Sequence, residues 1–191
     1  MTLSKNVMLE LAGHEGLVRQ AYKDSVGVWT WSVGITSQSG HLVERYIDKP
    51  QPLEHCLAVW EWVVREKYAP DVLWAFDRPL KEHQFAAALS FHYNTGGAKY
   101  WDKNRKVWKK ATWIEDYNRG DVTKAYEHFM NWSSPEEIIP RRKAERDLFF
   151  TGKWSNDGTM TEYTKVGAGY QPIWSSARKI KVDGILEDLL S

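Results

Sequence analysis

Hydrophobic and polar positions follow two different patterns along the chain. Residues 21–47 combine Val, Trp and Ile with spaced glycines, which is typical of two or three short strands joined by turns. Residues 53–67 instead carry apolar side chains at helical spacing from Leu53 to Val64, which predicts a helix with one apolar face. A short β-rich section is therefore followed by helical sequence.

Further helices are expected on both sides of this β-rich section. An N-terminal helix is predicted over 4–14, and a second over 82–95, where Gly96 and Gly97 would end it. The pattern also predicts helices near 107–118, 121–130 and 135–150. Ser134 would cap the last of these, while Pro140 allows a break or a new helix start.

The C-terminal residues 151–191 differ in composition from the rest of the chain. They are rich in Gly, Ser, Thr and Trp and end in a short amphipathic helix that begins near Asp183. They hold too few apolar residues to fold alone, so we expect them to pack on the helical body. The predicted fold is α+β and mostly α, with a small lobe over about 1–52, a helical lobe over about 53–150, and an extension over 151–191.

Composition excludes several classes of protein. The 26 Lys and Arg nearly balance the 25 Asp and Glu, so a strongly basic nucleic-acid binder is not expected. No apolar run approaches the ~20 residues that span a bilayer, and the N-terminus lacks a secretory pattern. We therefore expect synthesis in the cytoplasm without a signal peptide and no stable membrane insertion. Cys56 is the single cysteine and is expected to be a buried thiol.

Two carboxyl groups near the N-terminus are candidates for catalysis. Glu15 follows the first helix, and Asp24 lies in the adjacent β-rich section. Glycoside hydrolysis needs one carboxyl that donates a proton and another that stays ionised. A helix cap for Glu15 and a turn for Asp24 are the structural alternative. The six histidines have no metal-ligand spacing, so we expect neither a metal nor a cofactor.

The residues around these acids resemble the active-site segment of phage-type lysozymes, glycoside hydrolase family 24. The family's spacing of Glu, eight residues, Asp, five residues and Thr is met by Glu15, Asp24 and Thr30. Segments 84–96 and 139–149 also resemble the family, in its order, so that the resemblance covers roughly residues 5–152. The segment from Gly169 to Trp174 is similar to an extension found on some bacterial and prophage members.

The resemblance implies a lysozyme-like fold and a muramidase that is made in the cytoplasm of a bacterial host and cuts peptidoglycan in the periplasmic cell wall. Glu15 would be the general acid, Asp24 would orient water or stabilise the developing cation, and Thr30 would hold that water. The resemblance also suggests four substrate-binding residues, which are Trp29, Gly34, Asn94 and Arg142. Arg142 would reach the catalytic glutamate, with Arg141 as the second choice. Peptidoglycan is the implied partner, and a monomer is expected.

The sequence departs from the family pattern at two positions in the β-rich section. Ser32 stands where the family usually has glycine, and Ile35 stands where it usually has histidine. These departures leave Glu15, Asp24 and Thr30 intact and bear on the β-rich lobe and the sugar contacts near it. Two other functions remain open: a catalytically silent protein that binds the cell wall, against which the intact set argues, and a lytic transglycosylase, which needs an acid but no water-directing carboxylate.

Residues 99–113 interleave basic and aromatic side chains. Six positive residues (Lys99, Lys103, Arg105, Lys106, Lys109 and Lys110) and one negative residue, Asp102, give a local charge of +5. Stacking on nucleic acid is one interpretation, but a solvated helix face is the more common one. Contact with an anionic cell-envelope polymer is consistent with the enzyme hypothesis.

Overall fold

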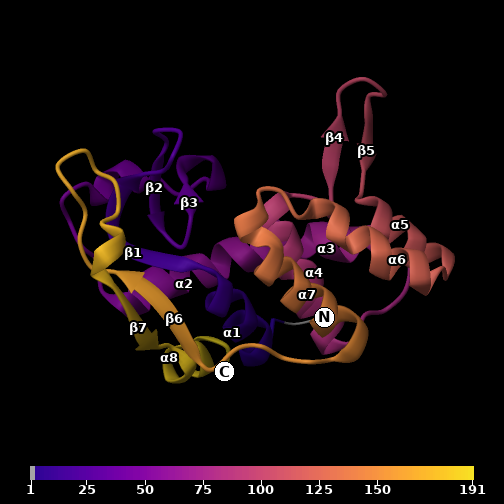
Figure 1. Cartoon of the computed structure of the whole chain (residues 1–191). Helices are drawn as coiled ribbons and strands as arrows, with labels where there is room; N and C mark the ends of the chain where they lie inside the picture. The colour runs from indigo at the N-terminus through magenta and orange to yellow at the C-terminus, as the bar shows by residue number, and fades with distance from the viewer. Residues whose placement is uncertain (1–2) are drawn as a thin grey trace. The chain divides into compact units, whose positions relative to one another are not determined.

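The computed structural model describes residues 3–191, and the chain divides into two compact units (Figure 1). The first unit runs to Lys67 and also includes Asn156–Ser191, whereas the second comprises Tyr68–Ser155. The structure is mostly helical with a mixed sheet, which confirms the predicted α+β class. The first unit extends past the small lobe that we expected to end near residue 52, and it includes most of the C-terminal extension.

The helices of the first unit are α1 (Lys5–His14), α2 (Leu53–Val63) and α8 (Asp183–Leu189). Helix α1 begins as predicted at Ser4, whose hydroxyl accepts a hydrogen bond from the Val7 N–H. Helix α2 ends before a π-helical turn at Val64–Tyr68. Cys56 on α2 is fully buried, as expected for a structural thiol.

The sheet of the first unit combines strands from both ends of the chain. Within residues 3–191 its order is β3-β2-β1-β6-β7. These strands are β1 (Gly16–Lys23), β2 (Trp29–Ser32), β3 (Ile35–Thr36), β6 (Thr159–Tyr163) and β7 (Ala177–Lys181). Strand β6 lies parallel to β1, with Gly16 opposite Thr161. The extension that we expected on the helical body thus lies beside β1 and continues the sheet of the first unit.

Apolar and ionic contacts hold the extension in place. Met160, Val182 and Leu186 are fully buried, and α8 packs against α1 and α2. Glu162 on β6 is buried and forms ion pairs with Arg19 of β1 at 2.6 Å and Arg178 of β7 at 2.8 Å. The extension therefore contributes core residues and charged partners to the first unit.

We expect the extension to resist proteolysis in the folded protein. Strand pairing and burial of Met160, Val182 and Leu186 keep its backbone out of reach of a protease. Limited proteolysis followed by mass spectrometry measures this protection, with thermal unfolding of any fragment as the second readout. Fast cleavage near Gly152 that leaves a fully stable and active fragment of residues 1–150 would contradict this expectation.

The second unit is a helical bundle around an aromatic core. Its helices are α3 (Ala69–Ala75), α4 (Glu82–Thr95), α5 (Thr112–Arg119), α6 (Val122–Phe129) and α7 (Ile139–Thr151). Helix α4 has the predicted bounds, and Gly96 ends it with a left-handed φ of 69°. The rings of Trp113 and Phe129 lie 4.4 Å apart between their centroids, and both residues are fully buried. Many of the aromatic residues thus fill a core.

The first residues of the segment expected to be helical over 107–118 instead form β5 (Val107–Lys109), which pairs with β4 (Tyr100–Asp102) in a β-hairpin. The Asp102 carboxylate accepts hydrogen bonds of 3.0 Å from the N–H groups of Asn104 and Arg105, which favours a turn there. Helix α5 starts only at Thr112. The helix predicted over 135–150 begins only at Ile139, with Pro140 in its first turn, so the break near Pro140 is confirmed. The cap expected from Ser134 is wrong, because a separate 3-10 turn at Glu136–Ile138 precedes the helix.

Candidate active site

Glu15 lies at the corner where α1 becomes β1. Its N–H donates to the Ala12 carbonyl at 3.2 Å, and its own backbone is extended, so the helix ends at this residue. The next residue, Gly16, pairs with β6, and a Cβ atom at Gly16 would lie 2.7 Å from the ring of Tyr163. Glycine is required for this close approach, and the backbone of Glu15 is fixed from both sides.

Asp24 directly follows β1 and shapes the turn that leads to β2. Its Oδ1 atom accepts hydrogen bonds from the N–H groups of Val26 at 3.0 Å and Val28 at 2.8 Å. Its own N–H donates to the Val28 carbonyl at 3.1 Å. The expected turn is therefore present, and it holds the carboxylate in one orientation at the end of the strand.

Thr30 is buried in β2 and faces Tyr22 across the β1–β2 pair. Its hydroxyl donates a hydrogen bond of 3.1 Å to the Val28 carbonyl. Because that bond uses the hydroxyl proton, the oxygen is left to act as an acceptor for further partners. Asp24 and Thr30 are thus linked through the backbone of Val28. Its N–H donates a hydrogen bond to the Asp24 carboxylate, and its carbonyl accepts one from the Thr30 hydroxyl.

Tyr22 connects the two candidate carboxyl groups electrostatically. Burial raises the pKa of the Tyr22 hydroxyl, and the negative charges of Glu15 and Asp24 raise it further. The Tyr22 hydroxyl is therefore neutral at pH 7, and it lies close enough to both acids for their charges to affect its pKa. Sequence reasoning did not single out this residue, because its position depends on a β-bulge between Val18 and Tyr22 that places it opposite Thr30.

The two departures from the family pattern have local structural explanations. Ser32 adopts a left-handed φ of 54°, a conformation that favours glycine, and its hydroxyl donates to the Cys56 carbonyl at 3.0 Å. Ile35 is buried opposite Trp31 in the β2–β3 pair. Gly34, between them, has a φ of 74° in the connecting turn. None of these departures alters Glu15, Asp24 or Thr30.

A pair of Ser32 substitutions tests whether the hydrogen bond to Cys56 offsets the backbone strain. Ser32→Gly removes a strain of about 1 kcal/mol and a hydrogen bond of about 1 kcal/mol, so the unfolding free energy should change by less than about 1 kcal/mol. Ser32→Ala keeps the strain but loses the bond, so we expect a loss of about 1–2 kcal/mol. Urea unfolding measures both, and equal losses for the two variants would contradict this account.

Trp29 begins β2 and is covered in part by the extension. Its ring packs edge-on against Tyr170 at 4.9 Å between centroids, and the Lys23 ammonium lies 5.3 Å from its centroid. Tyr170 is held in turn by its carbonyl, which accepts from the Lys23 N–H at 2.8 Å, and by its hydroxyl, which donates to Asp48 at 3.1 Å. The segment that resembles an extension motif therefore contacts the strand that carries Thr30.

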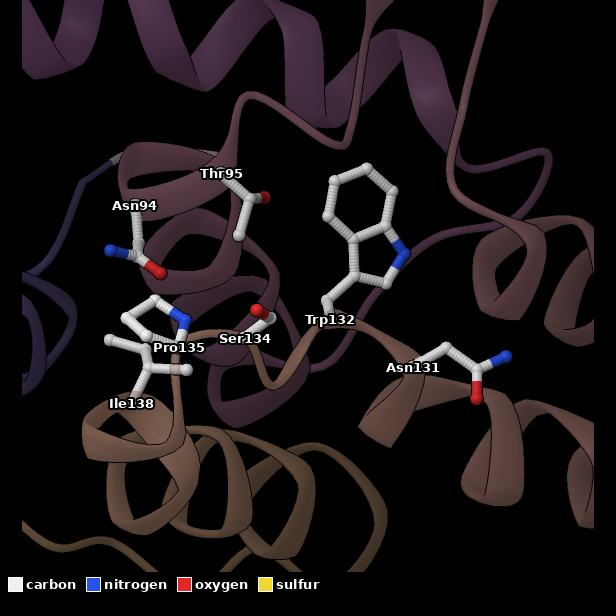
Figure 2. Close-up of a pocket in the computed structure, with 7 residues that line it drawn as sticks. All are labelled: Asn94, Thr95, Asn131, Trp132, Ser134, Pro135 and Ile138. Atoms are coloured by element: carbon white, nitrogen blue, oxygen red, sulfur yellow. The ribbon is translucent and has the colours of Figure 1, made fainter.

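The second unit contains a pocket of about 420 Å³ at the C-terminal end of α4, shown in Figure 2. The residues that line it are Asn94, Thr95, Asn131, Trp132, Ser134, Pro135 and Ile138. Asn94 is exposed, as a substrate-binding residue must be, and its Oδ1 accepts a hydrogen bond of 2.6 Å from Arg142.

Arg142 supports this pocket from inside the helical unit. It is fully buried, it pairs with Glu145, and its Nε donates to the Trp132 carbonyl at 3.0 Å. Arg141 also pairs with Glu145, at 2.8 Å, and donates to the Ser90 carbonyl at 3.1 Å. Arg142 is fully buried, and through these hydrogen bonds it positions Asn94 and the backbone of Trp132. The substrate contact predicted for Arg142 stays a prediction.

Known proteins resemble this chain over most of its length. The endolysin of Salmonella phage P22 is 27% identical over 159 residues, which cover 79% of this chain and 99% of that protein. The crystal structure of a P22 lysozyme mutant matches with a TM-score of 0.62 and 24% identity, over 79% of this chain and 99% of that one. The endolysin from Escherichia coli O157:H7 phage FAHEc1 matches with a TM-score of 0.63 and 21% identity, over 82% and 98%. Both structures show a lysozyme-like fold.

Among residues 3–191, no helix has both the length and the apolar character needed to cross a bilayer. The model of the phage lysozyme family matches residues 12–145, a stretch that includes Glu15, Asp24 and Thr30 and ends before the strands of the extension. Since this match covers well over half of the chain, the protein belongs to the phage lysozyme family.

Proposed function

We propose that the chain is a muramidase that hydrolyses the β-1,4 bond between N-acetylmuramic acid and N-acetylglucosamine. Family membership implies peptidoglycan hydrolysis and cell lysis. The observation that supports the chemical assignment is that Glu15 and Asp24, which flank β1, both lie close enough to Tyr22 for their negative charges to raise the pKa of its hydroxyl. Thr30, on the neighbouring strand, lies opposite Tyr22.

In this mechanism, Glu15 donates its proton to the glycosidic oxygen while the bond to the anomeric carbon breaks. The leaving sugar departs as an alcohol, and positive charge develops on the ring that keeps the anomeric carbon. Asp24 stabilises this charge or accepts a hydrogen bond from the water that attacks the same carbon. Its Oδ1 serves the turn, so its other oxygen, Oδ2, is the one that we assign to this role.

Thr30 helps to hold the water. Its hydroxyl donates to the Val28 carbonyl, so its oxygen can accept a hydrogen bond from the water and orient a lone pair toward the sugar. The water loses one proton as the new bond forms, and it leaves a hydroxyl on the anomeric carbon. The product is a reducing sugar, and the proton balance is restored through the carboxyl groups and solvent.

We assign substrate contacts in the second unit to Asn94. The Arg142 hydrogen bond fixes the Asn94 amide oxygen, so the amide nitrogen is the donor that a sugar hydroxyl or N-acetyl group can use. The adjoining pocket offers Trp132, Pro135 and Ile138 to the apolar parts of the glycan. Trp29, which Tyr170 partly covers, is a second candidate contact.

Analysis of the products from purified peptidoglycan tests this function. A new reducing end on N-acetylmuramic acid is the expected result. An anhydro-sugar would instead identify a lytic transglycosylase, because that reaction uses an internal hydroxyl in place of water. Binding to cell walls without any soluble product would identify the catalytically silent alternative. Clearing of outer-membrane-permeabilised cells provides a second readout of lysis.

A further inference from the structure

The charge of the chain is concentrated in the β4–β5 hairpin and its flanks. Residues 99–113 hold six of the 26 basic residues and one of the 25 acidic ones, so their charge is +5. The remaining residues hold 20 basic and 24 acidic side chains, which give −4. A protein with this separation of charge presents its basic segment first to an anionic surface.

The geometry of the hairpin places cations at its tip. Ion pairs lie toward its base, where Lys99 contacts Asp71 at 2.8 Å and Lys110 contacts Asp77 at 3.6 Å. Lys103, Arg105 and Lys106 occupy the turn, and all three are exposed. In Figure 1 the hairpin extends away from the helices of its own unit, so the tip can reach a flat surface.

Large apolar side chains accompany these cations. Trp101 and Trp108 face each other across the hairpin at 5.3 Å between ring centroids, and they are 46% and 54% exposed. Val107 beside them is 47% exposed. Trp74 on α3 joins the group, because Lys99 lies 5.6 Å from its centroid and 5.1 Å from that of Trp108. We call Trp74, Trp101, Val107 and Trp108, with the three tip cations, the hairpin patch.

We propose that the hairpin patch binds the surface of an anionic phospholipid bilayer. Tryptophan side chains favour the boundary between headgroups and acyl chains, because one end of the ring is apolar and the other carries an N–H. Lys and Arg beside them meet the phosphate groups of anionic lipids while their alkyl stems stay in the apolar layer. The contact is peripheral and differs from a membrane span.

The chemistry of the hairpin patch favours a bilayer over a polar polymer. A sugar site needs polar side chains that are placed to form hydrogen bonds with hydroxyl groups. The Asp102 carboxylate instead accepts hydrogen bonds from the backbone of the turn. The aliphatic side chain of Val107 next to the tip suits acyl chains. A polyanion such as a nucleic acid would use the cations but would gain less from Val107 and from rings packed edge to face.

Vesicle flotation with the full-length protein tests the proposal. We expect binding to vesicles of equal parts phosphatidylglycerol and phosphatidylcholine, and at least about tenfold weaker binding to phosphatidylcholine alone. Binding should weaken as ionic strength rises, because salt screens the tip cations. Equal binding to both vesicles, or binding to neither, would overturn the proposal.

Charge-matched variants separate the hairpin patch from overall charge. Replacing Lys103, Arg105 and Lys106 together by glutamine should weaken binding to the anionic vesicles at least about tenfold. Replacing the exposed Lys143, Lys153 and Lys179 by glutamine removes the same charge elsewhere and should have little effect. Similar losses in both triple variants would show a non-specific attraction and contradict a dedicated surface.

A second pair of variants tests the apolar contribution. Trp108→Ser should reduce vesicle binding several-fold, whereas Trp174→Ser, which alters another exposed tryptophan in the extension, should not. Circular dichroism and thermal unfolding confirm that each variant is folded. Hydrolysis of soluble glycan fragments should be unchanged in all these variants, so that this result is independent of the muramidase assignment. A different result is that the native protein binds sacculi or DNA and no vesicles, and that this binding is lost in the hairpin variants. This result would overturn the proposal and identify that polymer as the partner of the hairpin patch.

Discussion

Glu15→Gln should abolish hydrolysis of peptidoglycan while the fold remains intact. The amide is nearly the same size as the carboxyl group, but it cannot donate the proton that the leaving oxygen needs. Loss of a general acid typically costs about 10²–10⁴-fold in rate. The backbone of residue 15 is fixed by the end of α1 and by the pairing of Gly16, so the substitution should leave both elements in place. Release of reducing sugar measures the rate.

A matched control is Glu54→Gln, which makes the same change at an exposed position in the first turn of α2. This variant should keep the activity of the native protein, and both variants should show the thermal transition of the native protein within a few degrees. Retention of more than about a tenth of the activity by Glu15→Gln would remove Glu15 from the role of acid.

Local patterns predicted several elements because local interactions determine them. Helix α4 has its predicted bounds, since Gly96 supplies the left-handed residue that ends it. The turn at Asp24 was also expected, because an aspartate two residues before a backbone N–H readily closes such a turn. The spacing of Glu15, Asp24 and Thr30 suggested the family, and the family match includes all three.

Features that depend on distant contacts, and one hairpin that depends on a local turn, were not predicted. Strand β6 pairs with β1 across more than a hundred residues of sequence, and periodicity carries no information about such a partner. The β4–β5 hairpin lies in a basic segment whose spacing also suits a helix, and the turn bonds of Asp102 decide the outcome. The position of Tyr22 opposite Thr30 was not predicted, because a bulge sets its register. Arg142 was expected to contact substrate, yet its buried contacts with Asn94 and Trp132 could not be read from sequence.

Asp24→Asn should reduce turnover by about 10²-fold or more while affinity for glycan fragments stays nearly unchanged. The asparagine side chain keeps a carbonyl oxygen where Oδ1 accepts from Val26 and Val28, so the turn should be preserved. What is lost is the negative charge that stabilises the transition state and directs water. A charge that acts mainly in the transition state affects kcat far more than substrate binding.

Asp24→Ala separates the turn from the charge. It removes both turn hydrogen bonds, each with a net contribution of about 1 kcal/mol, so it should lower the unfolding free energy as well as the rate. Asp24→Asn should lower only the rate. Steady-state kinetics on a soluble glycan, equilibrium binding of a non-hydrolysed fragment and urea unfolding together resolve the two effects. An asparagine variant that binds fragments poorly but keeps its turnover would contradict this role. It would assign Asp24 to substrate binding, and the attacking water would then be oriented by Thr30 and other groups.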